Sequence, residues 1–199
     1  MPRAALVILA LCGVLLIGAV PLFAQKGTIE DLCRLHGIGS DESVQRIKNA
    51  FLDAEKSGIT EEELYPFVED ILKHKLDCGQ MVRVLAATTK LRLVGLPYFV
   101  VFSKVREGVA KEAPPALVVE AAESKLKTLT EARDVLRSLE SKGYRVRDFQ
   151  NAAVIVSSYI DRGYTAGEMV RQIRKKGIEG AGFAALSGVL EKPVKRKER

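Results

Sequence analysis

The chain has 199 residues, with 31 Lys and Arg against 25 Asp and Glu, a formal net charge of +6 and no tryptophan. A chain of this size can bury a hydrophobic core and fold on its own. The lack of tryptophan and an aromatic share of 6% argue against sugar-binding platforms and against surfaces that stack single-stranded nucleic acid.

The first 24 residues have the pattern of a signal peptide. Arg3 and the α-amino group form a positive start, an apolar run follows from Ala4, and the small residue Ala24 precedes polar Gln25. We therefore expect cleavage after Ala24 and export to the periplasm or the extracellular space. The alternative is a membrane anchor made by an uncleaved segment 4–24, because about 20 apolar residues suffice to cross a bilayer.

The rest of the chain has the apolar spacing of helices, and no long stretch alternates like a strand. Glycine and proline mark helix ends, and pairs such as Thr60 with Glu63 and Asp77 with Gln80 form capping boxes that open helices. The sequence predicts helices at 28–36 and 41–56, from 60 onward, and at 77–95, 97–110, 114–143, 147–161 and 165–176. A Gly- and Ala-rich stretch follows and ends in a short helix reaching 190.

Three similar turns indicate a diverged repeat. Gly58-Ile59-Thr60, Gly95-Leu96-Pro97 and Gly143-Tyr144-Arg145 each end one helix and begin a helix pair, at spacings of 37 and 48 residues. Helical hairpins stack because each exposes an apolar face to its neighbours. We expect an all-α fold of stacked antiparallel helical hairpins over residues 25–190, followed by a basic tail at 191–199; an irregular helical bundle is the alternative.

One stretch also carries a resemblance. The stretch begins with Gly95-Leu96-Pro97, continues with Lys-x-x-Glu-Gly-x-Ala-Lys from Lys104 to Lys111, and ends with Pro114-Pro115. This pattern resembles one in uncharacterised exported bacterial helical-repeat proteins. The flanking units match it more loosely. The resemblance implies a helical fold and export, and it brings no activity, cofactor or site residues with it.

Two cysteines and two histidines form the clearest chemical constellation in the mature chain. They occur as the pairs Cys33 with His36 and His74 with Cys78. An even cysteine count outside the cytoplasm first predicts a disulfide, here between Cys33 and Cys78. Unpaired buried thiols are the second interpretation. The third is a metal site made by Cys33, His36, His74 and Cys78, since zinc takes two thiolates and two imidazoles at such spacings.

Nothing in the sequence indicates an enzyme or a cofactor. The glycine-rich stretch 177–182 has no preceding strand and lacks the Lys-Ser/Thr of a phosphate-binding loop. The histidines have no Ser and Asp arrangement that would make a nucleophilic triad. We therefore expect a non-catalytic protein.

Basic residues gather near the C-terminus, where they could meet an anionic surface such as a membrane of acidic lipids. They are Arg171, Arg174, Lys175 and Lys176, and in the tail Lys192, Lys195, Arg196, Lys197 and Arg199. Nucleic acid is not expected as a partner because the chain is exported. The leading hypothesis is a structural or interaction protein of the cell envelope, with another envelope protein as its partner. The alternatives are an anionic-surface binder using the tail, and a metal-binding protein.

Overall fold

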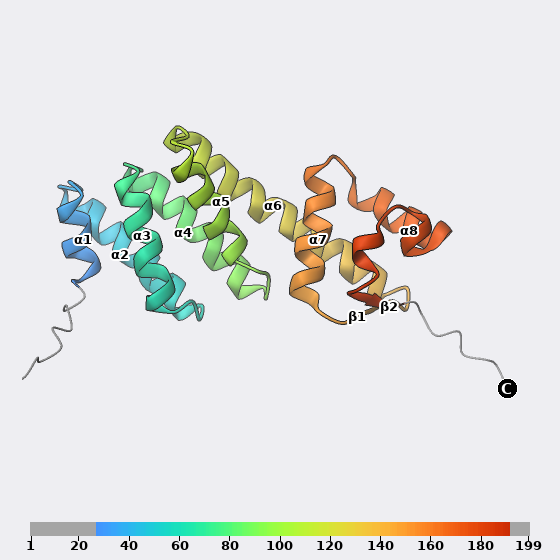
Figure 1. The fold of residues 1–199 in the computed structure, drawn as a ribbon. Helices are drawn as coiled ribbons and strands as arrows, with labels where there is room; N and C mark the ends of the chain where they lie inside the picture. Colours follow the sequence, from blue (N-terminus) through green and yellow to red (C-terminus); the bar gives the residue numbers. More distant parts are fainter. Residues whose placement is uncertain (1–26, 192–199) are drawn as a thin grey trace, which may run out of the picture.

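The structure is a computed structural model that describes residues 27–191, and these residues form a mostly helical, elongated arrangement (Figure 1). The helices are α1 (Ile29–Leu35), α2 (Asp41–Lys56), α3 (Glu61–Lys73), α4 (Cys78–Leu93), α5 (Phe99–Ala110), α6 (Pro115–Glu140), α7 (Phe149–Asp161) and α8 (Ala166–Gly180), with a 3-10 turn η1 (Ala184–Leu186) and short strands β1 (Arg145–Val146) and β2 (Leu190–Glu191). The all-α fold class expected from the sequence is confirmed.

Both capping boxes start helices where the sequence predicts them. The backbone amide of Asp77 donates to Gln80 Oε1 at 2.9 Å, and the amide of Gln80 donates to Asp77 Oδ1 at 2.9 Å. The amide of Thr60 donates to Glu63 Oε2 at 3.1 Å. Each of these bonds pairs an amide that the helix itself leaves without a partner, so the starts of α3 and α4 are fixed locally.

Equivalent glycine turns end α2 and α4. Gly58 and Gly95 have positive φ angles of 95° and 72°, in the left-handed region that a side chain disfavours. After each glycine the next amide, of Ile59 or Leu96, donates back to a helix carbonyl at 3.3 or 2.9 Å. Both following side chains are almost completely buried, so each turn also contributes a side chain to the core.

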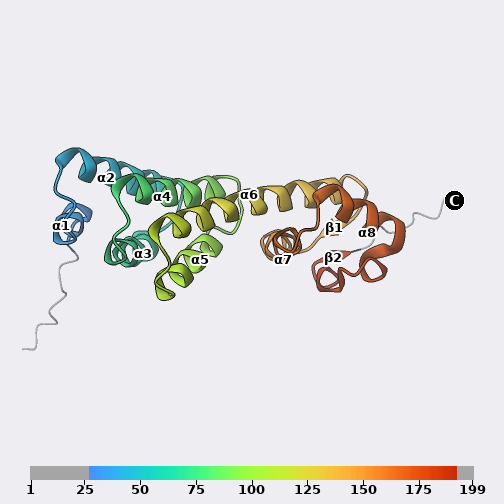
Figure 2. The ribbon, with the colours of Figure 1, turned by 90° about the horizontal axis from the view of Figure 1, so that it is seen from above.

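The first part of the molecule consists of two rows of helices. Seen from above, α2, α4 and the first half of α6 lie in one row, and α1, α3 and α5 lie beneath them (Figure 2). The closest packing joins α2 to α4 and α4 to α6. Phe67 of α3 stacks on Phe102 of α5 with ring centroids 3.9 Å apart, so the lower row is held together by aromatic packing as well.

The long helix α6 continues into the second part of the molecule, where α7 and α8 pack against it. The apolar side chains under α8 include Phe183, which is fully buried and meets the ring of Tyr159 edge to face at 4.9 Å. The N-cap of α7 is Asp148, whose side chain accepts from the Asn151 amide. Helix α6 is thus the element that joins the two parts.

The C-terminal end of the helical region differs from the sequence prediction. A helix reaching residue 190 was expected, but β2 pairs antiparallel with β1 there, with Arg145 opposite Glu191 and Val146 opposite Leu190. Glu191, which we assigned to the tail, therefore belongs to a strand. The predicted end of the preceding helix at 176 agrees with the structure, because Gly177, with a φ of 77° and a ψ of 172°, is not helical; what the sequence did not predict is the short helical segment after this kink, which carries α8 to Gly180.

Two of the predicted segments lie outside the described residues: the signal peptide 1–24, with its alternative as an anchor 4–24, and the tail beyond Glu191. Within residues 27–191, no helix combines the length and the hydropathy that crossing a membrane requires.

Candidate functional site

A groove of about 700 Å³ lies between the second half of α6 and helix α8. Asp134, Val135 and Ser138 of α6 line one side. A single stripe of α8 lines the other, and its members are Ala166, Gly167, Val170, Arg171, Arg174 and Lys175. Their alternating spacing of three and one residues is that of one face of a helix.

The sequence of α8 explains why its cations face the groove. Thr165 caps the helix by accepting a hydrogen bond from the Glu168 amide at 3.2 Å. Met169 and Ile173 are fully buried and fix the face that packs on the core. Side chains three and four residues apart share a helix face, so Met169 and Ile173 point toward the core together. Arg171 and Arg174, which lie on the other side of the helix, therefore point outward.

The groove carries an excess of positive charge. Three cations, those of Arg171, Arg174 and Lys175, line it together with one carboxylate, that of Asp134. Arg133 Nε already approaches Asp134 Oδ1 at 3.2 Å. None of the three cations takes part in an ion pair or a side-chain hydrogen bond within the described part of the chain.

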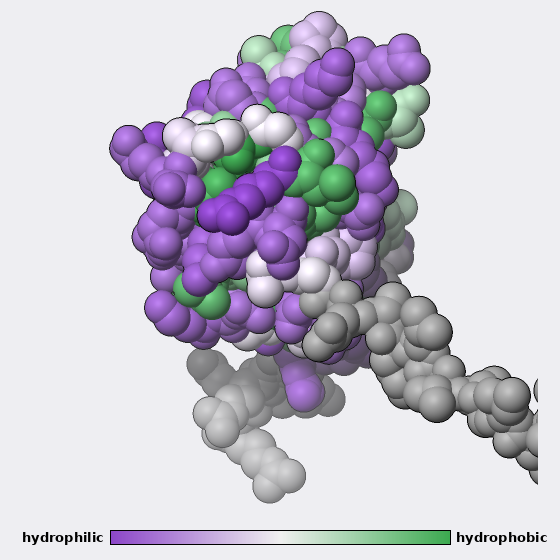
Figure 3. All heavy atoms as spheres, turned by 90° about the vertical axis from the view of Figure 1, so that its left-hand side faces the viewer, coloured by the Kyte–Doolittle hydropathy of each residue, from purple (hydrophilic) through white to green (hydrophobic). Residues whose placement is uncertain are grey.

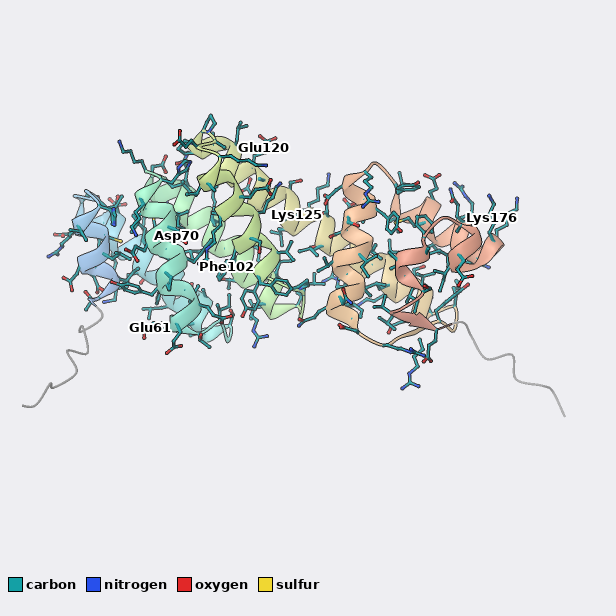
Figure 4. The ribbon with its side chains drawn as sticks, viewed as in Figure 1. Glu61, Asp70, Phe102, Glu120, Lys125 and Lys176 are labelled. Carbon is teal, nitrogen blue, oxygen red and sulfur yellow. The ribbon has the colours of Figure 1, made fainter. Side chains whose placement is uncertain are left out.

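Lys176 adds a fourth exposed cation beside the groove, and Figure 4 shows it on α8 near the right-hand end of the molecule. Of the four α8 cations that the sequence singled out, Arg171, Arg174 and Lys175 line the groove and Lys176 does not. The opposite wall on α6, formed by Asp134, Val135 and Ser138, was not predicted from the sequence.

A second, smaller groove of about 340 Å³ lies between α2 and α4. Arg46 and Asp53 of α2 and Lys90 of α4 are among its lining residues. Asp53 Oδ1 also lies 3.6 Å from Lys56 Nζ, one helical turn away on α2. This groove was not predicted from the sequence, and like the first it is lined by cations, here Arg46 and Lys90.

The predicted disulfide is absent, because Cys33 and Cys78 are both free thiols. Cys33 lies fully buried in the core, and Cys78 Sγ instead donates to the backbone carbonyl of Ser43 at 3.5 Å. Burial, with a smaller effect from Cys78, raises the pKa of the Cys33 thiol to about 11. A thiol with so high a pKa is almost entirely protonated at neutral pH and is therefore a poor nucleophile. This agrees with the second interpretation, unpaired buried thiols.

The four-residue zinc constellation does not form either. Among residues 27–191, no group of three or more His, Cys, Asp or Glu side chains is arranged to hold a metal ion. His74 Nε2 lies 2.6 Å from the carbonyl oxygen of Ala113, in the turn between α5 and α6, so the ring joins α3 to that turn. The predicted metal site of Cys33, His36, His74 and Cys78 is therefore not supported.

The opposite end of the molecule, seen in Figure 3, presents apolar side chains among hydrophilic ones over the first helices. Leu35, at the end of α1, has the most exposed large apolar side chain in the described residues, with 79% of its surface accessible. The tail residues Lys192, Lys195, Arg196, Lys197 and Arg199 lie outside the described residues.

The basic groove between α6 and α8 is thus the site best defined by its geometry. Comparison of the chain with protein-family models, with curated proteins and with solved structures gave no match.

Proposed function

We propose that this chain is an exported, non-catalytic protein of the cell envelope whose stacked helical hairpins offer a binding surface to another envelope protein. The observation that carries the proposal is the groove between α6 and α8. It has apolar side chains beside three cations, none of which forms an ion pair within the described residues. Exposed cations without partners over an apolar floor are typical of a surface that completes its contacts in a complex.

The regular spacing of the helices supports a repeat architecture. Helices α2, α4 and α6 begin at Asp41, Cys78 and Pro115, each 37 residues after the one before. The glycine turns at Gly58 and Gly95 are separated by the same interval. Stacked repeats of this kind present an extended surface, and most repeat proteins use that surface to bind other proteins.

Binding to an anionic surface is the second candidate function. It is favoured by the unpaired cations of α8, to which the predicted tail would add five more. A flat lipid layer, however, cannot enter a groove, and the side chains of Val135 and Val170 at its floor offer nothing to a phosphate. We therefore favour a protein partner.

The test is affinity capture from an envelope extract with the tagged full chain and two charge-reversed variants. The first variant, Arg171→Glu with Arg174→Glu, changes the α6–α8 groove. The second, Arg46→Glu with Lys90→Glu, makes the same change of charge in the α2–α4 groove. We expect at least one envelope protein to be retained by the native chain and the second variant and lost from the first. A set of captured proteins that is the same for all three would contradict the proposal.

A further inference from the structure

We infer that the groove between α6 and α8 binds an acidic amphipathic helix of the partner protein. This inference rests on the proposed function and specifies the chemistry of the partner. It is drawn from three properties of the groove: the spacing of its cations, the nature of its floor and its open length along α8.

The cations are spaced to match carboxylates on a helix. Arg171 and Lys175 lie four residues apart on α8, a rise of about 6 Å along the axis, and Arg174 lies between them. A helix laid along α8 presents Glu or Asp side chains at i and i+4 with the same rise. Arginine suits this task because its planar guanidinium can bond both oxygens of a carboxylate.

The floor of the groove is apolar and shallow. Val135 is buried, Val170 and Ala166 are half-buried, and a Cβ placed on Gly167 would meet no heavy atom within 4 Å. Small side chains on the floor allow the backbone of a partner helix to come close. A partner with alanine or leucine between its acidic positions would remove this floor from water.

The length of the groove also fits a helix. The lining stripe runs from Ala166 to Lys175, about 14 Å along the α8 axis, which is the length of two to three helical turns. A small anion would occupy only part of this length. No lining cation is buried, so the groove lacks the enclosed donors that hold a small anion in place.

A second copy of the chain is an alternative occupant. Residues 27–140 contain more acidic than basic side chains, whereas residues 141–191 contain more basic ones. Glu61 and Asp70 lie on α3, in the half of the molecule opposite α8 (Figure 4). The acidic excess of residues 27–140 is only three, with 19 acidic against 16 basic side chains, and Asp70 is already paired with Arg106 at 2.9 Å. We therefore assign the groove to a separate protein.

The experiment measures fluorescence anisotropy of a labelled synthetic helix with the full chain. The peptide has Glu at i and i+4 with Ala and Leu between, and a second peptide has Lys in place of every Glu. We expect saturable binding of the Glu peptide alone. Arg171→Glu with Arg174→Glu should weaken that binding about tenfold or more, and the matched pair Arg46→Glu with Lys90→Glu should leave it unchanged. The first variant should gain affinity for the Lys peptide.

Several results would overturn the inference. They are equal binding of both peptides, equal loss in both variants, or binding to phosphatidylglycerol vesicles with none to the Glu peptide. Concentration-dependent self-association lost in the first variant would assign the groove to a second copy instead. All four replaced side chains are at least partly exposed, and circular dichroism checks the fold. If the first variant loses its envelope partner but the native chain ignores the Glu peptide, the inference is wrong and the proposed function stands.

Discussion

Replacing Gly95 with alanine tests the glycine turns that end α2 and α4. Gly95 has a φ of 72°, and a Cβ there would meet no heavy atom within 4 Å. The change therefore adds backbone strain without a clash. Placing an L-residue in the left-handed region destabilises the folded state by roughly 1–2 kcal/mol. Alanine also restricts the unfolded chain more than glycine does, which offsets about 0.4–1 kcal/mol of this loss. We expect Gly95→Ala to lower the free energy of unfolding by about 1 kcal/mol.

Two further variants make this a matched set. Glu112 has a φ of 52° in the turn after α5, so Glu112→Gly should relieve strain and raise the free energy of unfolding by about 0.5 kcal/mol. Gly167 is the second residue of α8 and lies in equally open space, so Gly167→Ala should stabilise, by less than the roughly 1 kcal/mol of a position inside a helix, with the same atoms added as at Gly95.

Urea unfolding of the full chain, followed by far-ultraviolet circular dichroism, measures all three variants. The sign of each change separates backbone strain from a general effect of the methyl group. A stabilising Gly95→Ala, or a destabilising Glu112→Gly, would show that these turns do not depend on residues that tolerate the left-handed conformation.

Three further predictions concern the core, the thiols and pH. Phe67→Ala removes the fully buried ring stacked on Phe102 and should lower the free energy of unfolding, measured in urea, by about 3–5 kcal/mol. Phe67→Leu should lower it by less. A loss below about 1 kcal/mol for Phe67→Ala would contradict this packing. Iodoacetamide at pH 8 should modify Cys78 of the reduced chain well before Cys33, because Cys33 is buried and its pKa is about 11. Mass spectrometry of the peptides measures the two rates. Equal rates would show that Cys33 is accessible. Hydrogen bonds from two flanking lysines hold the pKa of Glu107 at about 2, below its usual 4.5. The difference in melting temperature between the native chain and Glu107→Gln should therefore shrink as pH falls from about 4.5 to about 2. A difference that stays constant over this range would argue against the ion pairs.

The sequence predicts most of the fold because helix boundaries are encoded by near neighbours. The capping box of Asp77 and Gln80 and the glycine turns at Gly58 and Gly95 each involve residues within one turn of the helix end, so the pattern is readable in one dimension. The pairing of β1 with β2 is not readable in this way. It joins Arg145 to Glu191 across two residues of strand, too short for any alternation to appear.

The candidate site is only half predictable for a similar reason. The α8 cations stand out in the sequence because they are clustered, but Asp134 and Ser138 become their neighbours only when α6 packs against α8. The cysteine and histidine pairs show the converse, because their spacing predicts a site that the structure does not form. Local spacing suggested ligands, yet His74 bonds the carbonyl of Ala113, 39 residues away, and Cys33 is buried in the core.

Photocrosslinking in the living host tests most directly whether the basic groove is a protein-binding surface. A photoreactive amino acid replaces Ser138 on the wall of the groove and, as a control, the exposed Ala116 near the start of α6. We expect a protein adduct from Ser138 that disappears when Arg171 and Arg174 are changed to glutamate, and no such adduct from Ala116. A groove position that yields no protein adduct, or one that survives the charge reversal, would contradict it.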